Sequence, residues 1–241
     1  MVGEPLEVHG LMSNASTTGE ITAATTIPAA PPSWLAARLN PRVLPFGMRL
    51  LACLAQAIFV RAAVLAYLAD TSRITLLILI ATEVASFLGL MFSRPATATD
   101  YTPAALAMVA VVYCYVVFLD GSPGIKLIPE QAGAAIQIIG LSWTVYAKLS
   151  IGRSFGLLPA NRGIVVVGAY RWVRHPIYAG YLVTHIGFLA ANFGLHNLVV
   201  FSVLYFVQGL RVLREEALLS RMAEYRAYVQ QVRYRILPGV F

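Results

Sequence analysis

The chain has 241 residues, of which 59% are hydrophobic and only 12% are charged, and its mean hydropathy is +0.72. A soluble globular domain carries about twice that share of charge, so the composition excludes this class and predicts a polytopic membrane protein. The net charge of +7 is explained by Lys and Arg gathered on one side of a bilayer, so it does not require a nucleic-acid partner.

The first 33 residues are predicted to form a flexible tail. They are rich in Ala, Ser, Thr and Pro, and no long apolar core follows a basic start, so they do not read as a secretory signal. Cys53 and Cys114 both lie inside apolar runs, which argues against a disulfide framework. The four histidines are widely separated in the sequence, and we expect no metal site.

Six apolar segments follow the tail, each close to the ~20 residues that span a bilayer. They predict an all-α membrane bundle of about six transmembrane helices, with a range of five to six, and no Rossmann domain. We divide the chain into the tail (1–33), N-terminal transmembrane helices (34–128) and a catalytic membrane core (129–241). The segments run over residues 46–69, 74–92, 103–119, 129–150, 176–193 and 196–214.

The Lys and Arg residues set the expected orientation. With the N-terminus in the cytosol, all of them except Arg61, Arg73 and Lys126 fall on or near the cytosolic face. We therefore expect both termini and the long loop 151–175 to be cytosolic, as in a multi-pass protein of a bacterial inner membrane.

Two ionisable residues lie deep in the first two spans, Arg61 and Glu83. Each is ~12–14 Å from the expected outer helix ends, so their matched depth predicts a buried pair that locks the two helices together. A functional role for an intramembrane pair is the alternative, which we weigh as less favoured because both residues are far from the polar stretch described next.

That stretch runs from Gly168 to Gly180, with the sequence Gly-Ala-Tyr-Arg-Trp-Val-Arg-His-Pro-Ile-Tyr-Ala-Gly. The residue before a proline avoids the α region, and proline is well tolerated at the first helical position, so a membrane helix is expected to begin at Pro176. Free backbone N–H groups beside Arg174 and His175 would attract an anion. The alternative is a basic, aromatic anchor at the membrane interface.

The fifth and sixth spans are predicted to form an antiparallel hairpin, joined by a tight turn over residues 192–197. Gly180, Gly187 and Gly194 recur every seven residues and make one smooth face for close helix packing. His185 is expected to be a hydrogen-bonded core histidine. The hairpin would return Arg211 and Glu215 to the same membrane boundary as the Gly168–Gly180 stretch.

A site at this boundary can join a water-soluble reagent to a lipid-embedded one. It holds cations, carboxylates and aromatic faces, and it has no Walker loop, dinucleotide signature or nucleophile triad. Methyl transfer from a sulfonium suits such a site, because this reaction depends on alignment more than on acid–base chemistry. Aromatic rings can face the sulfonium charge, and a carboxylate can bind ribose hydroxyls.

The stretch Gly168–Gly180, Glu215-Glu216-Ala-Leu-Leu, Tyr225-Arg-Ala-Tyr228 and Val232-Arg-Tyr-Arg-Ile-Leu-Pro238-Gly together resemble the signature of the isoprenylcysteine carboxyl methyltransferase family. The resemblance covers about residues 140–241. It implies an integral-membrane methyltransferase that uses S-adenosyl-L-methionine, without a metal, and a C-terminal helical hairpin that encloses the cofactor. The partners it implies are a lipid-like or prenylated acceptor and membrane lipids.

The same resemblance implies roles for individual residues. The catalytic residues would be Arg211, Glu215 and Glu216, with Arg211 facing the carboxylate of the acceptor; which of the two glutamates contacts the cofactor stays open. The cofactor would be lined by Arg162, Gly163, Ile164, Val165, Tyr170, Arg174, His175, Pro176, Ile177, Tyr178, Gly180 and Glu215.

Other functions remain open on the sequence. The same site could methylate a phospholipid amine or a small thiol, and an amine acceptor would need Glu215 or Glu216 as a base. A nicotinamide-dependent membrane reductase is a further possibility, because fold alone does not fix chemistry. A transporter is less favoured, since the sequence shows no internal repeat and no pair of broken spans.

Overall fold

A computed structural model describes residues 43–91, 98–99, 102–154, 160–161 and 164–239. The expected tail over residues 1–33 lies outside this part of the chain. The α-helices are α2 (Val43–Ala69), α3 (Ile74–Met91), α4 (Pro103–Cys114), α5 (Glu130–Ile151), α6 (Pro176–Ala191), α7 (Leu195–Leu219) and α8 (Ala223–Gln231). Short 3-10 helices are η1 (Tyr115–Phe118), η2 (Gly152–Ser154) and η3 (Gly168–Arg171), and two-residue strands β1 (Ala98–Thr99) and β2 (Ala160–Asn161) pair antiparallel.

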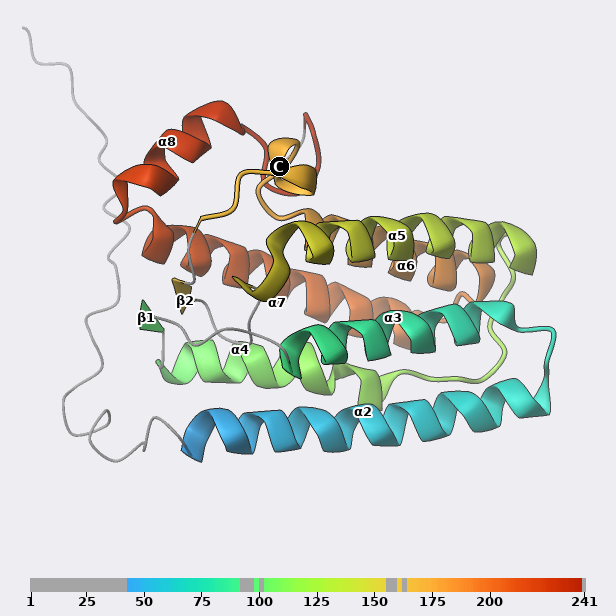
Figure 1. Cartoon of the computed structure of the whole chain (residues 1–241). Helices are drawn as coiled ribbons and strands as arrows, with labels where there is room; N and C mark the ends of the chain where they lie inside the picture. The colour runs from blue at the N-terminus through green and yellow to red at the C-terminus, as the bar shows by residue number, and fades with distance from the viewer. Residues whose placement is uncertain (1–42, 92–97, 100–101, 155–159, 162–163, 240–241) are drawn as a thin grey trace, which may run out of the picture.

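All six expected spans are helices, so the prediction of an all-α bundle is confirmed. Three helices are long and apolar enough to cross a membrane, Phe46–Ala69, Glu130–Ile151 and Leu195–Leu219. The other three are shorter apolar helices, Ile74–Leu88, Pro103–Phe118 and Pro176–Ala191. Figure 1 shows α2 to α7 packed along one another, with α8 at the end of the bundle where α7 ends.

The surface of the bundle carries the side chains expected of a protein in lipid. Large apolar residues stand exposed on the outward faces of the long helices, among them Leu54 and Leu68 on α2 and Phe206 on α7. A soluble monomer rarely exposes such side chains over contiguous faces. The fold is therefore that of a membrane helix bundle.

The closest helix contact joins α5 to α6 through small residues. A Cβ added to Gly140 would lie 2.5 Å from the Thr184 hydroxyl, and one added to Gly187 would lie 2.8 Å from the Gly133 carbonyl oxygen. The predicted packing role of Gly180 and Gly187 is confirmed. It is wrong for Gly194, which precedes α7 and has open space around it, because α6 already ends at Ala191.

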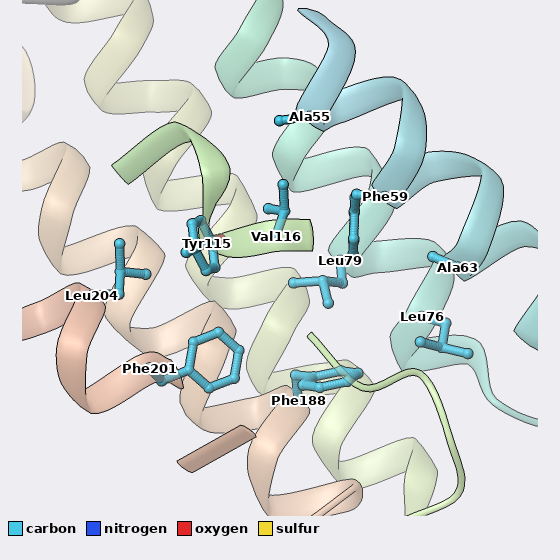
Figure 2. Packing of buried hydrophobic residues seen from close by; sticks show 10 residues of the cluster. All are labelled: Ala55, Phe59, Ala63, Leu76, Leu79, Tyr115, Val116, Phe188, Phe201 and Leu204. Atoms are coloured by element: carbon cyan, nitrogen blue, oxygen red, sulfur yellow. The ribbon is translucent and has the colours of Figure 1, made fainter. Parts of the chain in front are cut away.

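The main hydrophobic core lies between α2, α3, η1, α6 and α7 (Figure 2). Helix α2 contributes mostly small residues on its inner face, which lets the aromatic rings of η1, α6 and α7 fill the space. The buried members drawn are Ala55, Phe59, Ala63, Leu76, Leu79, Tyr115, Val116, Phe188, Phe201 and Leu204.

A buried polar cluster closes the end of the bundle where α3 and α5 begin. The guanidinium of Arg73 donates to the Asn192 side-chain oxygen at 2.9 Å, and the amide of Asn192 donates to the Thr75 hydroxyl at 2.8 Å. The backbone N–H of Thr75 donates to the Glu130 carboxylate at 2.8 Å. These bonds tie α3, α5 and the α6–α7 turn together, so the turn end of the hairpin is fixed.

Candidate functional site

At the opposite end of the bundle, Glu216 on α7 receives three donors. Its Oε1 lies 2.8 Å from Arg174 Nε and 3.3 Å from His175 Nε2, and its Oε2 lies 2.8 Å from Arg235 Nε. The Glu216 side chain is only 12% exposed, so these contacts are shielded from water. We call these four residues the Glu216 clamp.

The local backbone explains why the clamp forms there. His175 has a φ of −127° and a ψ of 59°, outside the α region, and α6 begins at Pro176, which confirms the predicted helix start. The N–H groups of Arg174 and His175 donate to the carbonyl oxygens of Tyr234 and Arg235, at 3.0 and 2.7 Å. The Glu216 carboxylate lies beside this helix start, but side chains hold it, and these two backbone N–H groups are not free, contrary to the prediction.

The two polar ends of the α6–α7 hairpin meet as predicted, since Arg174 and Glu216 are in direct contact. The two neighbouring glutamates differ in their surroundings. Glu216 is held by the clamp, whereas Glu215 has no hydrogen bond to a described residue and lies within electrostatic range of Arg211 and Tyr178. Glu215 is therefore the carboxylate with free acceptor atoms.

Three tyrosines cover the clamp. Tyr228 on α8 donates its hydroxyl to the Tyr170 carbonyl oxygen at 2.7 Å. Tyr225 packs beside Tyr228, and its buried hydroxyl has no hydrogen-bond partner among the described residues. Burial raises the pKa of all three phenols, and the nearby Glu215 raises that of Tyr170 further. They remain protonated hydrogen-bond donors at neutral pH.

The remaining residues of the Arg-His-Pro-x-Tyr segment occupy different surroundings. The Tyr178 ring stacks on the His175 ring, with centroids 5.8 Å apart and an interplanar angle of 11°. The Pro176 carbonyl oxygen accepts a hydrogen bond from Trp143 Nε1 at 3.0 Å. Ile177 belongs to the apolar core, and Gly180 faces α5 at Thr144.

The stretch from Arg162 to Val165 is partly described. Arg162 and Gly163 lie outside the described residues. Ile164 packs on the apolar cluster formed by Tyr225, Tyr228 and Val232, next to the clamp, and Val165 is half-buried.

A cavity of about 40 Å³ lies between α2, α3, α4, α6 and α7. Arg211 and Tyr178 line it near the clamp, and Glu83 and His185 line it deeper in the bundle. Arg211 is only 4% exposed and is hydrogen-bonded to Tyr113. We call this space the central cavity, and it joins the predicted acceptor-binding arginine to the buried polar residues of α3 and α6.

The predicted pair of Arg61 with Glu83 is wrong. Arg61 is exposed on α2, and Glu83 accepts a hydrogen bond from the Tyr115 hydroxyl at 2.8 Å. His185 is a hydrogen-bonded core histidine, as predicted, since its ring nitrogens lie 3.1 Å from the Tyr115 hydroxyl and 2.7 Å from the Tyr205 hydroxyl. Equal depth along two helices does not determine which faces of those helices meet.

Sequence reasoning missed two features of this site. Arg235 lies in the motif that begins at Val232, but nothing in the local sequence pattern indicated that the segment after α8 folds back onto Glu216. The tyrosine-rich wall of the central cavity was also missed, although an intramembrane Glu followed by Tyr113 and Tyr115 on the next span was a usable signal.

Comparison with known proteins gives one family. No curated protein matches the chain. The model of a family described as "Protein of unknown function (DUF1295)" matches residues 96–232, which is more than half of the chain. The match spans the Arg-His-Pro-x-Tyr segment, Arg211 and most of the clamp, and it begins after Glu83. The resemblance to isoprenylcysteine carboxyl methyltransferases stays a prediction. The chain belongs to the DUF1295 family.

Proposed function

We propose that this protein is a membrane methyltransferase that uses S-adenosyl-L-methionine and methylates the carboxylate of an amphipathic, isoprenylcysteine-like acceptor. One observation carries the proposal. The Glu216 clamp joins the Arg-His-Pro-x-Tyr segment to the end of α7, and Tyr228 joins α8 to Tyr170 beside it. Tyr178 of the same segment lines a cavity that contains a buried arginine. A polar site of this kind beside a lipid-facing bundle suits one soluble and one amphipathic reactant.

The residues present fit the proposed cofactor. The buried Tyr225 hydroxyl has no hydrogen-bond partner among the described residues, and Glu215 lies within electrostatic range of it, so both can bind the hydroxyls of a ribose. The stacked rings of His175 and Tyr178 offer an aromatic face to a sulfonium cation. When bound, S-adenosyl-L-methionine supplies an activated methyl group.

Arg211 is the residue expected to orient the acceptor. A carboxylate held by this guanidinium is already ionised, so no base is needed to activate it. With the cofactor bound, the carboxylate oxygen would form a bond to the methyl carbon while the carbon–sulfur bond breaks, with its electron pair remaining on sulfur. The main contribution of the protein to the rate would be to position the two reactants, because in-line displacement depends on their alignment.

Methylation of an amine or a thiol at the same site is the near alternative. It requires a base, and Glu215 suits this role better than Glu216, whose two oxygens already accept from Arg174, His175 and Arg235.

The clamp end of the bundle carries an excess of Lys and Arg, so we place this end on the cytosolic side of the membrane.

A nicotinamide-dependent reductase is a second candidate, and one observation favours it. The Tyr115 hydroxyl in the central cavity lies between Glu83 and His185. Such a phenol could donate a proton to a carbonyl oxygen while a hydride adds to the carbonyl carbon. This reduction would take place at the deep end of the cavity. Carboxyl methylation needs no acid and gives the Tyr115 hydroxyl no role.

Ligand-induced stabilisation separates the two candidates. We expect S-adenosylhomocysteine to raise the melting temperature of the detergent-solubilised protein, because a ligand that binds only the folded state stabilises it by ~2.7 kcal/mol at a hundred times its Kd. NADPH at the same concentration should leave the melting temperature unchanged. A shift with NADPH and none with S-adenosylhomocysteine would replace the methyltransferase with the reductase.

A further inference from the structure

We infer that the deep end of the central cavity binds a small cationic group of the acceptor. The acceptor would then be an amino carboxylate, with its carboxylate at Arg211 and its ammonium group at Glu83. This inference rests on the proposed function and names the substrate class of the same site. It departs from a plain prenyl acid, whose far end is apolar.

The charges of the cavity wall give the first reason. Glu83 is 8% exposed, and within the described residues its ion-pair partner is His185, at 3.7 Å. Both ring nitrogens of His185 are engaged by the hydroxyls of Tyr115 and Tyr205. Lys148 also acts on Glu83 electrostatically. A carboxylate buried in a membrane bundle is costly without a cation in direct contact, and a ligand ammonium group would supply that contact.

The other wall of the cavity carries the opposite charge. Arg211 lines the cavity itself, and Lys148 on α5 lies over the ring of Tyr181, another lining residue, at 5.3 Å from its centroid. Arg211 is sixteen residues into α7 and Glu83 nine residues into α3. Since both helices begin at the same end of the bundle, the two charges differ in depth by about 10 Å. The cavity is therefore cationic near the clamp and anionic at depth.

Unsatisfied polar atoms give the second reason. Gln208 on α7 is 5% exposed and lines the cavity, and its Oε1 has no hydrogen-bond partner among the described residues. The Nε2 of Gln56 on α2 is also buried without a partner in that part of the chain. An ammonium group can donate to the Gln208 carbonyl oxygen. Gln56 Nε2 is itself a donor and needs an acceptor, so Gln208 alone supports a cation here.

The size of the cavity gives the third reason. A volume of about 40 Å³ holds a few water-sized groups, far below the ~300 Å³ of the smallest typical ligand pockets. A long prenyl chain does not fit there, and the space suits only the small ammonium end of an acceptor. A prenyl chain of the same acceptor would have to lie against the lipid-facing side of the bundle.

The test compares three small ligands by the concentration dependence of the melting temperature in detergent. The ligands are ω-aminohexanoate, hexanoate and N-acetyl-ω-aminohexanoate, which share the carboxylate and differ in the far-end charge. We expect ω-aminohexanoate to bind at least about tenfold more tightly than the other two, as charge-assisted hydrogen bonds allow. Glu83→Gln keeps the shape of the side chain and should abolish this preference.

Two further variants complete the design. Arg61→Gln, at an exposed position on α2, should leave the preference unchanged. Gln208→Leu should weaken binding of ω-aminohexanoate more than binding of hexanoate, and it serves as the test if Glu83→Gln does not fold. Equal binding of the three ligands, including no binding of any, would overturn the inference, as would a preference that survives both cavity substitutions.

The same preparation separates this inference from the proposed function. Stabilisation by S-adenosylhomocysteine without a preference for the amine would leave the methyltransferase intact and remove the amino-carboxylate class. A preference for the amine that depends on Glu83, without stabilisation by S-adenosylhomocysteine, would keep the cationic subsite and remove the methyltransferase.

Discussion

Replacement of Glu216 by alanine is expected to lower the free energy of unfolding by roughly 3 kcal/mol or more. The substitution removes the acceptor of Arg174 and Arg235 at once, and the Arg174 side chain is only 5% exposed. Breaking a buried ion pair from one side is costly, because the remaining charge stays out of water without compensation. For a chain of this size the melting temperature in detergent should fall by roughly 6–12 °C.

Glu224→Ala is the matched control, because this glutamate is exposed on α8, close to the clamp in sequence. Its melting temperature should stay within about 2 °C of the unsubstituted protein, as expected for a surface position. An equal fall for both variants would show that loss of charge near α8, rather than loss of the clamp, is responsible. A Glu216→Ala protein as stable as the original would contradict the clamp.

Gly140→Leu is expected to abolish assembly of the bundle. Even a single Cβ at this position would lie 2.5 Å from the Thr184 hydroxyl and 2.7 Å from the Gly180 carbonyl oxygen, so α5 and α6 would have to separate. Membrane helices associate through close packing of small residues, and separation forfeits that packing. The expected result is no monodisperse protein on size-exclusion chromatography after extraction.

Gly209→Leu on α7 supplies the control, because a Cβ there meets nothing within 4 Å. The same increase in size and hydrophobicity should then leave the yield of monodisperse protein unchanged. Recovery of folded Gly140→Leu protein at the level of the control would show that α5 and α6 do not pack as closely as described.

Much of the fold follows from local sequence signals. The six apolar runs, the helix start at Pro176 and the turn after Ala191 were predictable, because apolar length, proline and turn residues act on the nearest few residues. The meeting of Arg174 with the end of α7 was predictable too, since a hairpin of two spans returns the chain to its starting boundary.

The contacts that the sequence did not reveal depend on which face each helix turns toward its neighbours. Arg61 and Glu83 have matching depth, but Arg61 points outward while Glu83 points to Tyr115 and His185. The role of Arg235 was hidden for a similar reason, because the path of the tail after α8 is set by backbone bonds to Arg174 and His175. Long-range pairings of this kind leave no periodic trace in one sequence.

Transfer of a labelled methyl group from S-adenosyl-L-methionine is the most direct test of the proposed activity. Purified protein would be offered a farnesylcysteine analogue, phosphatidylethanolamine and a small thiol, and each product would be tested for lability in base. We predict a base-labile methyl ester on the farnesylcysteine analogue, reduced at least about tenfold by Arg211→Gln, since a lost charge-assisted contact is worth ~1.5–3 kcal/mol, and retained in part by Arg211→Lys. Absence of transfer to any acceptor, by a preparation that S-adenosylhomocysteine does not stabilise, would contradict the methyltransferase.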